Sequence, residues 1–271
     1  MHKLTCSIVI YQQRACTLMP LVLNLTNCQL IEKLYLIDNS PINTLHSLAT
    51  HPKIEYIFNN ANLGYGAGHN VAVKKALAKS KYHIVVNPDI MFEPGTIEKM
   101  YDYMQANHAV GLLMPKINYP NGTLQYACKL LPTPADLILR RFLPAALIKN
   151  RTAYFEMHDS GYNKIMEVPY LSGCFMFLRT EALNKAGLFD ERFFMYPEDI
   201  DLTRRIHKHY KTIFYPYADI THVHERGSYK SIRLLFVHII NMIKYFNKWG
   251  WFFDSERKQV NEKIRSQYTR R

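Results

Sequence analysis

The 271-residue sequence has too little of several features that would each define a class of protein. No stretch approaches the ~20 consecutive apolar residues of a membrane-spanning helix, because the longest candidate, 234–246, is interrupted by His238, Asn241 and Lys244. The five cysteines are scattered and form no Cys-x-x-Cys pair, which argues against a disulfide framework or a zinc knuckle and fits a reducing cytoplasm. The apolar N-terminal run is too short for a signal peptide and predicts a first strand.

Basic and apolar residues are abundant instead. The 34 Lys and Arg against 22 Asp and Glu give a net charge of +12, which favours an anionic partner such as nucleic acid, an anionic membrane surface or a phosphorylated ligand. Nucleic-acid binding is disfavoured, because the sequence has no continuous basic stripe with a known reading motif. Hydrophobic and aromatic fractions of 48% and 13% predict an ordered globular protein.

Strand-like and helix-like segments alternate through the first 115 residues. This order predicts parallel βαβ units with right-handed crossovers, and therefore an α/β fold. The expected strands are 4–11, 33–37, 54–58, 83–86 and 110–114, and the expected helices are 18–30, 67–79 and 94–107, with Pro94 in the first turn of the last.

The second half is less regular. Residues 116–161 predict loops with a short helix near 135–142, and 168–179 predict a strand that contains Ser172-Gly173. We expect a short helix over 180–186 capped by Thr180, a helix over 199–210 and a strand over 212–215.

Each expected strand of the first half ends in a polar or acidic residue. Tyr11, Asp38, Asn59 and Asn87 stand at these ends, and a nucleotide binds at such a rim in open α/β sheets. In Asn87-Pro88-Asp89 the proline stops strand pairing, so Asp89 is displayed and can ligate a hard divalent cation. Taken alone, each of Asp38 and Asp89 is better explained as a turn residue.

Alternating glycines follow the third expected strand. In Asn62-Leu63-Gly64-Tyr65-Gly66-Ala67-Gly68-His69-Asn70 they open a helix, where glycine allows the backbone to approach a phosphate or sugar closely. The spacing is not Gly-x-Gly-x-x-Gly, so it is weak as a dinucleotide fingerprint, and a flexible strand-to-helix turn is the alternative.

An acidic cluster follows an apolar block further along the chain. Glu198 and Asp199 come after Phe193-Phe194-Met195-Tyr196-Pro197, and a carboxylate beside apolar walls can have a raised pKa and act as a general base. Acids that stabilise the first turn of a helix are the alternative. Asp201 is expected to pair with Arg204 or Arg205.

Two histidines two residues apart end the next apolar segment. His222 and His224 share a face if they lie on a strand, but a third zinc ligand at a recognisable spacing is missing. One of them could complete the shell of a cation held by Asp89, and Arg226 and Lys230 could meet phosphate oxygens.

Together these segments resemble family 2 glycosyltransferases, in particular their bacterial rhamnosyltransferase-like branch, over roughly residues 4–230. The motifs that carry the resemblance are Ser7-Ile8-Val9-Ile10-Tyr11, Ile37-Asp38-Asn39-Ser40, the glycine segment 62–70, Asn87-Pro88-Asp89, Ser172-Gly173, Phe194-Met195-Tyr196-Pro197-Glu198-Asp199-Ile200-Asp201-Leu202 and the segment 222–228.

The resemblance implies the GT-A fold, with a Rossmann-like, mostly parallel sheet flanked by helices, and sugar transfer with inversion from a nucleotide-diphosphate-sugar. It implies that Asp199, beside Glu198, is the general base, that Asp38 contacts the nucleotide base, and that Asp89 with His222 or His224 holds Mg²⁺ or Mn²⁺. The expected nucleotide-sugar contacts are Tyr11, Asp38, Asn60, Asn62, Gly64, Asn70, Asn87, Arg226 and Lys230.

Two positions depart from the family pattern. Asn87 stands where the family's metal motif often has its first acid, and the first strand ends Ile10-Tyr11-Gln12 rather than Thr-Tyr-Asn. The branch favours dTDP-rhamnose, and UDP-sugars remain open as donors. A nucleotidyltransferase or another nucleotide-binding α/β enzyme is the alternative, since it would use the same rim without a base at Asp199.

The C-terminal residues 231–271 are apolar, aromatic and basic together. They predict an amphipathic helical extension of a catalytic domain at 1–230, itself made of a nucleotide-binding half at 1–115 and an acceptor-binding half at 116–230. Trp249 and Trp251 beside several lysines suit a membrane interface, and a helix packed on the catalytic domain is the alternative. We expect peripheral attachment to the cytoplasmic face of the cell membrane and a lipid-linked saccharide acceptor for surface polysaccharide.

Overall fold

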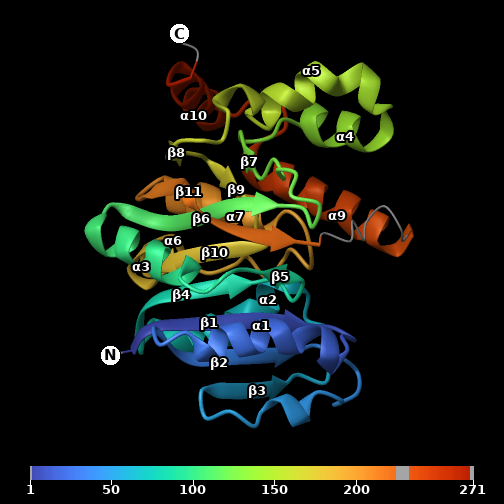
Figure 1. Ribbon diagram of the computed structural model, residues 1–271. Coiled ribbons are helices and arrows are strands. Elements are labelled where there is room, and N and C mark those ends of the chain that lie inside the picture. The colour runs from blue at the N-terminus through green and yellow to red at the C-terminus, as the bar shows by residue number, and fades with distance from the viewer. Residues whose placement is uncertain (1, 224–231, 269–271) are drawn as a thin grey trace.

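One nine-stranded sheet organises the computed structural model, which describes residues 2–223 and 232–268 (Figure 1). The strand order is β3-β2-β1-β4-β10-β6-β11-β5, and β8 pairs with β11 outside this path. The strands are β1 (His2–Ile10), β2 (Ile31–Asp38), β3 (Ile54–Phe58), β4 (Ser80–Val86), β5 (Ile90–Met91), β6 (Val110–Asn118), β8 (Met166–Glu167), β10 (Phe175–Arg179) and β11 (Lys211–His222).

The long pairings of the sheet are parallel, as the alternation of strands and helices predicts. β1 runs parallel to both β2 and β4, β2 runs parallel to β3, and β6 runs parallel to β11. β10 is antiparallel to both β4 and β6, which it separates. The carboxyl ends of β1, β2, β3 and β4 therefore lie at one edge, and the polar rim predicted from the sequence forms there.

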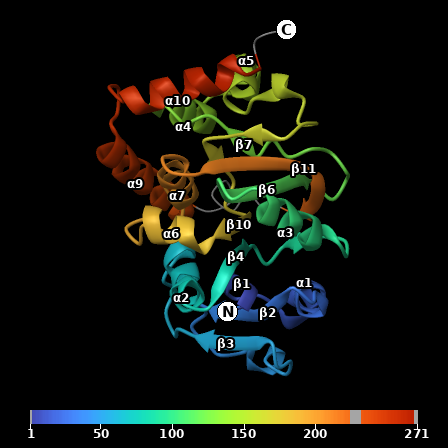
Figure 2. The ribbon, with the colours of Figure 1, turned by 90° about the vertical axis from the view of Figure 1, so that its left-hand side faces the viewer.

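Helices cover both faces of the sheet (Figure 2). α1 (Ala15–Asn27) and α3 (Thr96–Ala106) lie on one face, and α2 (Tyr65–Leu77), α6 (Thr180–Ala186) and α7 (Glu198–His207) lie on the other. Because the strands are buried from both sides, β4 is apolar along most of its length, and Ile84, Val85 and Val86 are fully buried.

Three local expectations are wrong. α3 begins at Thr96 after Gly95, whose φ of 89° turns the chain, so Pro94 lies before the helix. The N-cap of α6 is Arg179, and the Thr180 hydroxyl instead donates to the carbonyl oxygens of Ser80 and Lys81.

The third wrong expectation is the continuous strand over 168–179. It is split into β9 (Tyr170–Leu171), which pairs with β7 (Cys128–Lys129), and β10 in the main sheet. Ser172, Gly173 and Cys174 connect the two and are free of strand pairing, so their backbone groups can serve a site.

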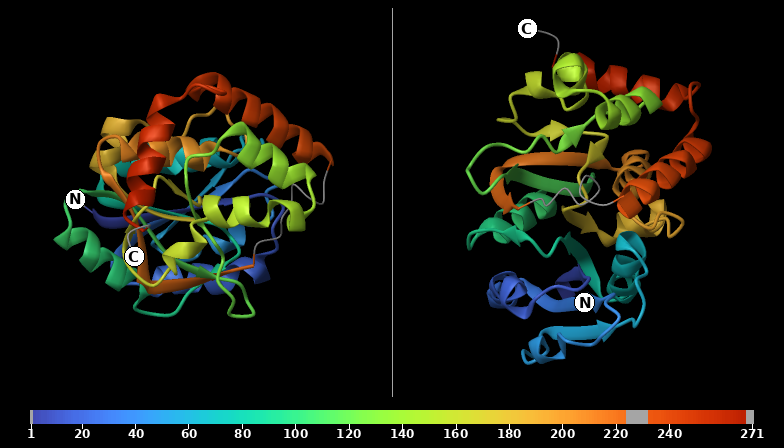
Figure 3. Two further views of the ribbon diagram at one scale, coloured as in Figure 1. Left: turned by 90° about the horizontal axis from the view of Figure 1, so that it is seen from above. Right: turned by 90° about the vertical axis from the view of Figure 1, so that its right-hand side faces the viewer.

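α4 (Pro134–Phe142) confirms the short helix expected near 135–142, and α5 (Ala145–Phe155) is a second helix where loops were expected. They lie beside α10 (Ser255–Ser266), at the end of the molecule opposite β3 (Figure 3). Short 3₁₀ turns, η1 (His46–Leu48) and η2 (His158–Ser160), complete the elements.

The C-terminal helix α9 (Ile232–Trp249) is docked on the catalytic core by one face. Tyr245 and Phe246 are buried in a cluster with Leu131, Phe193 and Ile200. No helix within 2–223 or 232–268 is long and apolar enough to cross a membrane.

Candidate active site

The ends of β1, β2 and β3 are joined by backbone hydrogen bonds. The Asn39 N–H donates to the Ile10 carbonyl oxygen at 2.9 Å, and the Asn59 N–H donates to the Asp38 carbonyl oxygen at 2.9 Å. Tyr11 follows β1 at this rim and is 44% exposed, so its ring is available to a ligand. The structure thus brings together the strand ends that the sequence predicted.

Asp38 is fully buried at the end of β2. Its Oδ1 accepts from the Ser40 N–H at 2.8 Å, and its Oδ2 accepts from the Tyr56 hydroxyl at 2.6 Å. Burial and this hydrogen bond raise the pKa of Tyr56, so Tyr56 remains a donor. Asp38 therefore fixes the turn after β2, and its contact with a nucleotide base stays a prediction.

The glycine segment makes close contact with the loop that carries the acid pair. Gly64 has a φ of 87°, and a Cβ there would lie 2.1 Å from the Phe194 carbonyl oxygen. That oxygen accepts from the Tyr65 N–H at 2.9 Å. Asn62 accepts from the Gly64 N–H through Oδ1 at 3.1 Å, and Asn60 has a φ of 50°. Gly64 thus joins the start of α2 to the segment before Glu198, and sugar contacts by this segment stay predictions.

Asn70 has a structural role that the sequence prediction did not foresee. It is 1% exposed, its Nδ2 donates to the Phe189 carbonyl oxygen and to Glu191, and its Oδ1 accepts from the Phe189 N–H. An amide used in this way holds the loop before α7, and a direct contact between Asn70 and the nucleotide-sugar stays a prediction.

Asp89 and His222 meet where β5 pairs with β11. Nε2 of His222 lies 3.4 Å from Oδ1 of Asp89, and the side chains are 6% and 28% exposed. Two ligands of one octahedral Mg²⁺, each about 2.1 Å from the ion, lie roughly 3 Å apart. The two atoms are therefore spaced for one hard cation, whose remaining positions diphosphate oxygens and water would fill. A cluster of three or more candidate ligands does not occur in the described parts of the chain.

Gln125 determines which nitrogen of His222 faces Asp89. Its Nε2 donates to the His222 carbonyl oxygen at 2.7 Å, so its Oε1 is the atom 3.1 Å from His222 Nδ1. Nδ1 must therefore carry a proton, and Nε2 is the atom left to face Asp89 or a cation. Burial lowers the pKa of His222, but hydrogen bonds to Asp89 and Cys174 outweigh it and raise the pKa to about 10. A cation bound at Asp89 would replace that Nε2 proton.

Asn87 lies beside the same imidazole. Its Nδ2 is 3.5 Å from His222 Nε2, and its backbone N–H donates to the Cys174 carbonyl oxygen at 2.9 Å. The residue in the place of the missing first acid is thus within reach of the proposed cation site. His224, Arg226 and Lys230 lie outside the described residues, so their proposed roles remain predictions.

The acid pair begins α7. Burial and the charge of Asp199 raise the pKa of Glu198 to about 8, and its Oε2 has no hydrogen-bond partner among the described residues. Burial also raises the pKa of Asp199. However, Asp199 is only half-buried and accepts from the Gly173 N–H at 3.0 Å and the Ile200 N–H at 2.8 Å, which favour its charged form. A proton shared by the pair therefore resides on Glu198, and Asp199 is the carboxylate.

Asp201 points away from this site. Its Oδ2 accepts from Arg205 Nε at 2.8 Å, as one of the two pairings expected from the sequence. Its Oδ1 accepts from Lys248 and from the Trp249 indole of α9, at 2.6 and 2.8 Å. Arg204 pairs instead with Asp254.

Residues 172–174 connect the acid pair to the cation site. The Gly173 N–H binds Asp199, while Cys174 binds the Asn87 backbone and interacts with His222. Tyr65 closes the arrangement, because its hydroxyl donates to the Gly173 carbonyl oxygen at 2.6 Å. The candidate general base, Asp199, and the candidate cation site at Asp89 and His222 thus lie on two sides of residues 172–174.

Sequence reasoning missed two residues near Asp199. Lys129 on β7 pairs in register with Tyr170 on β9, and its Nζ lies 5.1 Å from the Tyr170 ring. Burial and the Arg140 charge lower the pKa of Lys129, and the charges of Glu156 and Asp199 partly oppose that effect. The segment around Lys129 has no helical or strand periodicity, so the sequence offers no signal for it.

The mostly parallel α/β sheet with helices on both faces is the arrangement of the GT-A fold. Residues 7–187 match the family model described as Glycosyl transferase family 2. The protein belongs to glycosyl transferase family 2, as its sequence motifs predict.

Curated relatives and solved structures agree with this placement. The chain is 29% identical over 188 residues to N-acetylglucosaminyl-diphospho-decaprenol L-rhamnosyltransferase of Mycobacterium tuberculosis, covering 64% of the chain and 59% of that protein. It is 26% identical over 183 residues to rhamnosyltransferase WbbL of Escherichia coli K12, covering 64% of the chain and 66% of that protein. The chain thus spans less than two thirds of the length of these relatives.

Two solved structures share the fold. GalNAc-T7, in a crystal structure with UDP, GalNAc and Mn²⁺, aligns with a TM-score of 0.61 at 16% identity, covering 82% of this chain and 43% of that one. Staphylococcus aureus TarS 1–349 aligns with a TM-score of 0.55 at 17% identity, covering 88% and 66%. At these identities the likeness concerns the fold, and it confirms the expected GT-A architecture.

Proposed function

We propose that this protein transfers a hexosyl group, with rhamnosyl as the leading candidate, from a nucleotide-diphosphate-sugar to a saccharide acceptor with inversion. The observation that carries the proposal is the link through Gly173 and Cys174, which places the Asp199 carboxylate on one side and the Asp89–His222 pair on the other. A single-displacement transfer needs these two groups and no enzyme nucleophile.

Asp199 acts as the general base in this mechanism. The acceptor hydroxyl oxygen attacks the anomeric carbon as the bond from that carbon to the diphosphate oxygen breaks, and the hydroxyl proton passes to Asp199. Attack opposite to the leaving group inverts the anomeric centre. Glu198 stays protonated beside Asp199, so the pair carries one negative charge and the raised pKa of Asp199 makes it a better proton acceptor.

The leaving nucleoside diphosphate needs its charge neutralised. Mg²⁺ or Mn²⁺ held by Asp89 and His222 would supply that neutralisation. Gln125 keeps the imidazole in place by accepting from Nδ1 at 3.1 Å, and Asn87 lies beside the ring. Arg226, Lys230 and His224 remain proposed as further contacts to the diphosphate or the cation.

A lipid-linked saccharide is the proposed acceptor. The mycobacterial relative is named for transfer of L-rhamnose to an N-acetylglucosaminyl-diphospho-decaprenol, and the Escherichia coli relative is also named a rhamnosyltransferase. These names support a lipid-linked acceptor and a rhamnosyl donor. The dTDP-linked form of that donor, with UDP-linked donors as the alternative, and a role in surface-polysaccharide synthesis are proposed from the resemblance of the sequence motifs.

α9 is proposed to attach the protein peripherally to the cytoplasmic face of the cell membrane. Four exposed apolar side chains follow a helical spacing along it: Ile232, Phe236, Ile240 and Ile243. The helix contains no acidic residue and carries Arg233 and Lys244, while its third cation, Lys248, pairs with Asp190 and Asp201 of the core. Its opposite face packs on the catalytic core, and Asn241 Nδ2 donates to the Met195 carbonyl oxygen at 2.9 Å. Such a helix suits the surface of an anionic bilayer.

A donor panel tests the proposed reaction. Nucleoside diphosphate release would be measured with dTDP-rhamnose, dTDP-glucose, UDP-glucose and UDP-N-acetylglucosamine, each with Mg²⁺, Mn²⁺ or a chelator. We expect slow hydrolysis of one donor, with release of a nucleoside diphosphate and dependence on the cation. Consumption of a nucleoside triphosphate and a sugar phosphate with release of pyrophosphate would instead establish a nucleotidyltransferase and overturn the proposal.

A further inference from the structure

A cavity lies outside the candidate active site, between the α4–α5 pair and the turn that joins α9 to α10. Its volume is about 680 Å³, within the range of roughly 300–1,000 Å³ typical of small-molecule sites. The apolar part of its wall is formed by Leu130, Leu131, Tyr154, Phe155, Phe252 and Phe253.

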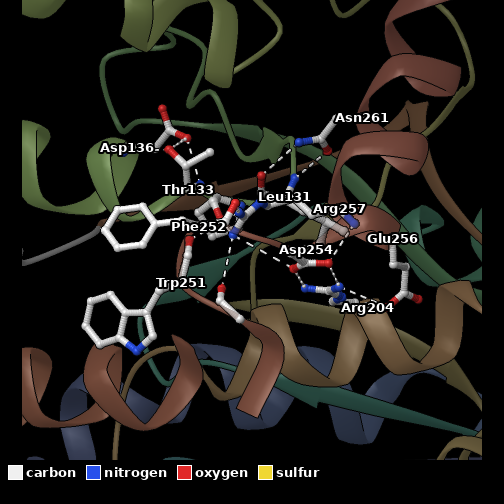
Figure 4. A network of polar contacts seen from close by, with 12 residues as sticks. Leu131, Thr133, Asp136, Arg204, Trp251, Phe252, Asp254, Glu256, Arg257 and Asn261 are labelled. Carbon is white, nitrogen blue, oxygen red and sulfur yellow. Dashed lines mark hydrogen bonds and ion pairs between the residues drawn. The ribbon is translucent and has the colours of Figure 1, made fainter. Parts of the chain in front are cut away.

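A buried arginine fixes the turn that forms one wall of this cavity. Arg257 is 6% exposed, and its guanidinium donates to the carbonyl oxygens of Pro132, Gly250, Trp251 and Phe252 at 3.2 to 3.4 Å (Figure 4). Four carbonyl contacts from one side chain hold the turn in a single conformation.

Asp254 fixes the same turn through a second set of contacts. Asp254 accepts from Arg204 through both carboxylate oxygens at 2.7 Å and caps α10 by accepting from the Arg257 N–H at 2.9 Å (Figure 4). Arg204 is 2% exposed. This scaffold holds two adjacent aromatic side chains in solvent, with Phe252 80% and Phe253 97% exposed. A rigid turn that displays two phenylalanines gains free energy when an apolar ligand covers them.

The opposite wall of the cavity is linked to the candidate active site through Leu131 and Lys129. Asn261 of α10 exchanges two hydrogen bonds with the backbone of Leu131, each at 2.9 Å. Leu131 packs in the cluster that contains Ile200, the residue after Asp199. Lys129, two residues earlier, lies on β7 beside Tyr170 at the acid pair. A ligand in the cavity is thus one short segment away from the acceptor side of the active site.

The charged rim of the cavity is already neutralised. Arg151 donates to Asp136 at 2.8 Å and to Thr133 at 3.0 Å, and Lys258 lies 4.0 Å from Glu262. A free anion would therefore gain little there, and the cavity favours an uncharged apolar ligand.

We propose that this cavity binds the isoprenoid chain of the lipid-linked acceptor while the saccharide enters the cleft beside Asp199. The proposal rests on the proposed function, because only a lipid-linked acceptor carries such a chain. Phe252 and Phe253 cover the chain at the mouth of the cavity, and the buried Leu130 and Leu131 form its floor on the side of β7.

Photolabelling of the full chain tests the cavity directly. The probe is farnesyl phosphate bearing a diazirine on its terminal isoprene unit, and labelled peptides are mapped by mass spectrometry. We expect saturable labelling within 130–133, 151–155 and 251–258. Labelling that does not saturate, or that falls only on the exposed face of α9, would overturn the proposal.

A double variant, Phe252→Ser with Phe253→Ser, gives the quantitative comparison. Both side chains are exposed, so the substitutions remove little packing, and an unchanged melting temperature would verify the fold. We expect the half-saturating probe concentration to rise about tenfold or more. Ile42→Ser, which replaces another exposed apolar residue, is the matched control and should leave it unchanged. Equal saturation curves for wild type and the double variant would contradict the proposal.

Donor hydrolysis by the wild-type protein separates the two levels of inference. A protein that hydrolyses a nucleotide-sugar but shows no saturable labelling keeps the proposed function and loses the cavity site. A protein that is labelled but turns over no nucleotide-sugar keeps an isoprenoid site and loses the proposed function.

Discussion

The Gly173 backbone N–H donates to Oδ2 of Asp199 at 3.0 Å, and a Cβ on Gly173 would lie 3.0 Å from the Asp199 Cβ. The break between β9 and β10 therefore positions the carboxylate that begins α7. The same contact favours the charged form of Asp199, which distinguishes it from the buried Glu198.

Gly173→Ala should displace Asp199 by a few tenths of an ångström and slow transfer. Because catalysis depends on close positioning of the base, we expect kcat to fall about tenfold or more with little change in the dissociation constant of the donor. Steady-state kinetics and calorimetry would measure the two. Ser172→Ala leaves both hydrogen bonds to Asp199 in place and serves as the control. A normal kcat for Gly173→Ala would show that the contact is incidental.

Gln125→Ala should weaken cation binding although Gln125 does not face the cation. Loss of the partner that orients His222 is expected to reduce metal affinity about 10- to 100-fold. Asp89→Asn removes a proposed cation ligand itself and should abolish Mn²⁺-dependent binding of a nucleoside diphosphate. Calorimetric titration of UDP and dTDP with and without Mn²⁺ would measure this. Gln105→Ala, at an amide away from the site, is the control. Retention of Mn²⁺-dependent binding by Asp89→Asn would remove Asp89 from the cation site.

Glu198→Gln should change how stability depends on pH. The folded state raises the pKa of Glu198 to about 8 from the usual value near 4.5. Between these values the folded state holds a proton that the unfolded chain has released, so this group makes wild-type stability fall as pH rises. The variant lacks this pH-dependent contribution to the free energy of unfolding. The contribution is roughly 1.4 kcal/mol for each unit by which the pKa is raised.

Urea unfolding at pH 5, 7 and 9 would measure that difference. We expect the stability of Glu198→Gln relative to wild type to increase with pH. Glu191→Gln is the matched control, because hydrogen bonds from Asn70 and Lys74 lower the pKa of Glu191. Its pH dependence therefore lies below pH 5, and its stability relative to wild type should stay constant from pH 5 to 9. Parallel curves for wild type and Glu198→Gln would mean that Glu198 is charged in the folded protein.

Phe236→Ser combined with Ile240→Ser should weaken binding to anionic vesicles. These side chains are 60% and 50% exposed, so the substitutions spare the core and remove apolar area from the side of α9 that we propose to contact lipid. Flotation with vesicles of phosphatidylglycerol and phosphatidylethanolamine would measure the bound fraction, with Ile42→Ser as the control. If the double variant floats as well as wild type, α9 is not the attachment surface.

Much of the fold could be predicted because its signals are local. The strand over 54–58 and the helix over 180–186 agree with β3 and α6 residue for residue. The polar rim follows from strand ends that the sequence shows directly. The Asp201–Arg205 pair follows from a spacing of four residues on one helix.

The connections of the site could not be predicted in the same way. Gln125 reaches His222 only because an irregular segment folds against β11, 97 residues away in the chain. As a sequence pattern, the alternating glycines Gly64, Gly66 and Gly68 are equally compatible with the close approach of a ligand and with close packing inside the protein. In the structure, a Cβ at these positions would meet Phe194, Phe189 and Val9, and only tertiary packing reveals that.

Asp199→Asn tests the central claim most directly. Single-turnover transfer and donor binding would be measured side by side for this variant and wild type. The account predicts that the transfer rate falls by roughly 10²- to 10⁴-fold while the donor dissociation constant stays within about threefold. A variant that transfers sugar at the wild-type rate would contradict the assignment of Asp199 as the base and the mechanism built on it.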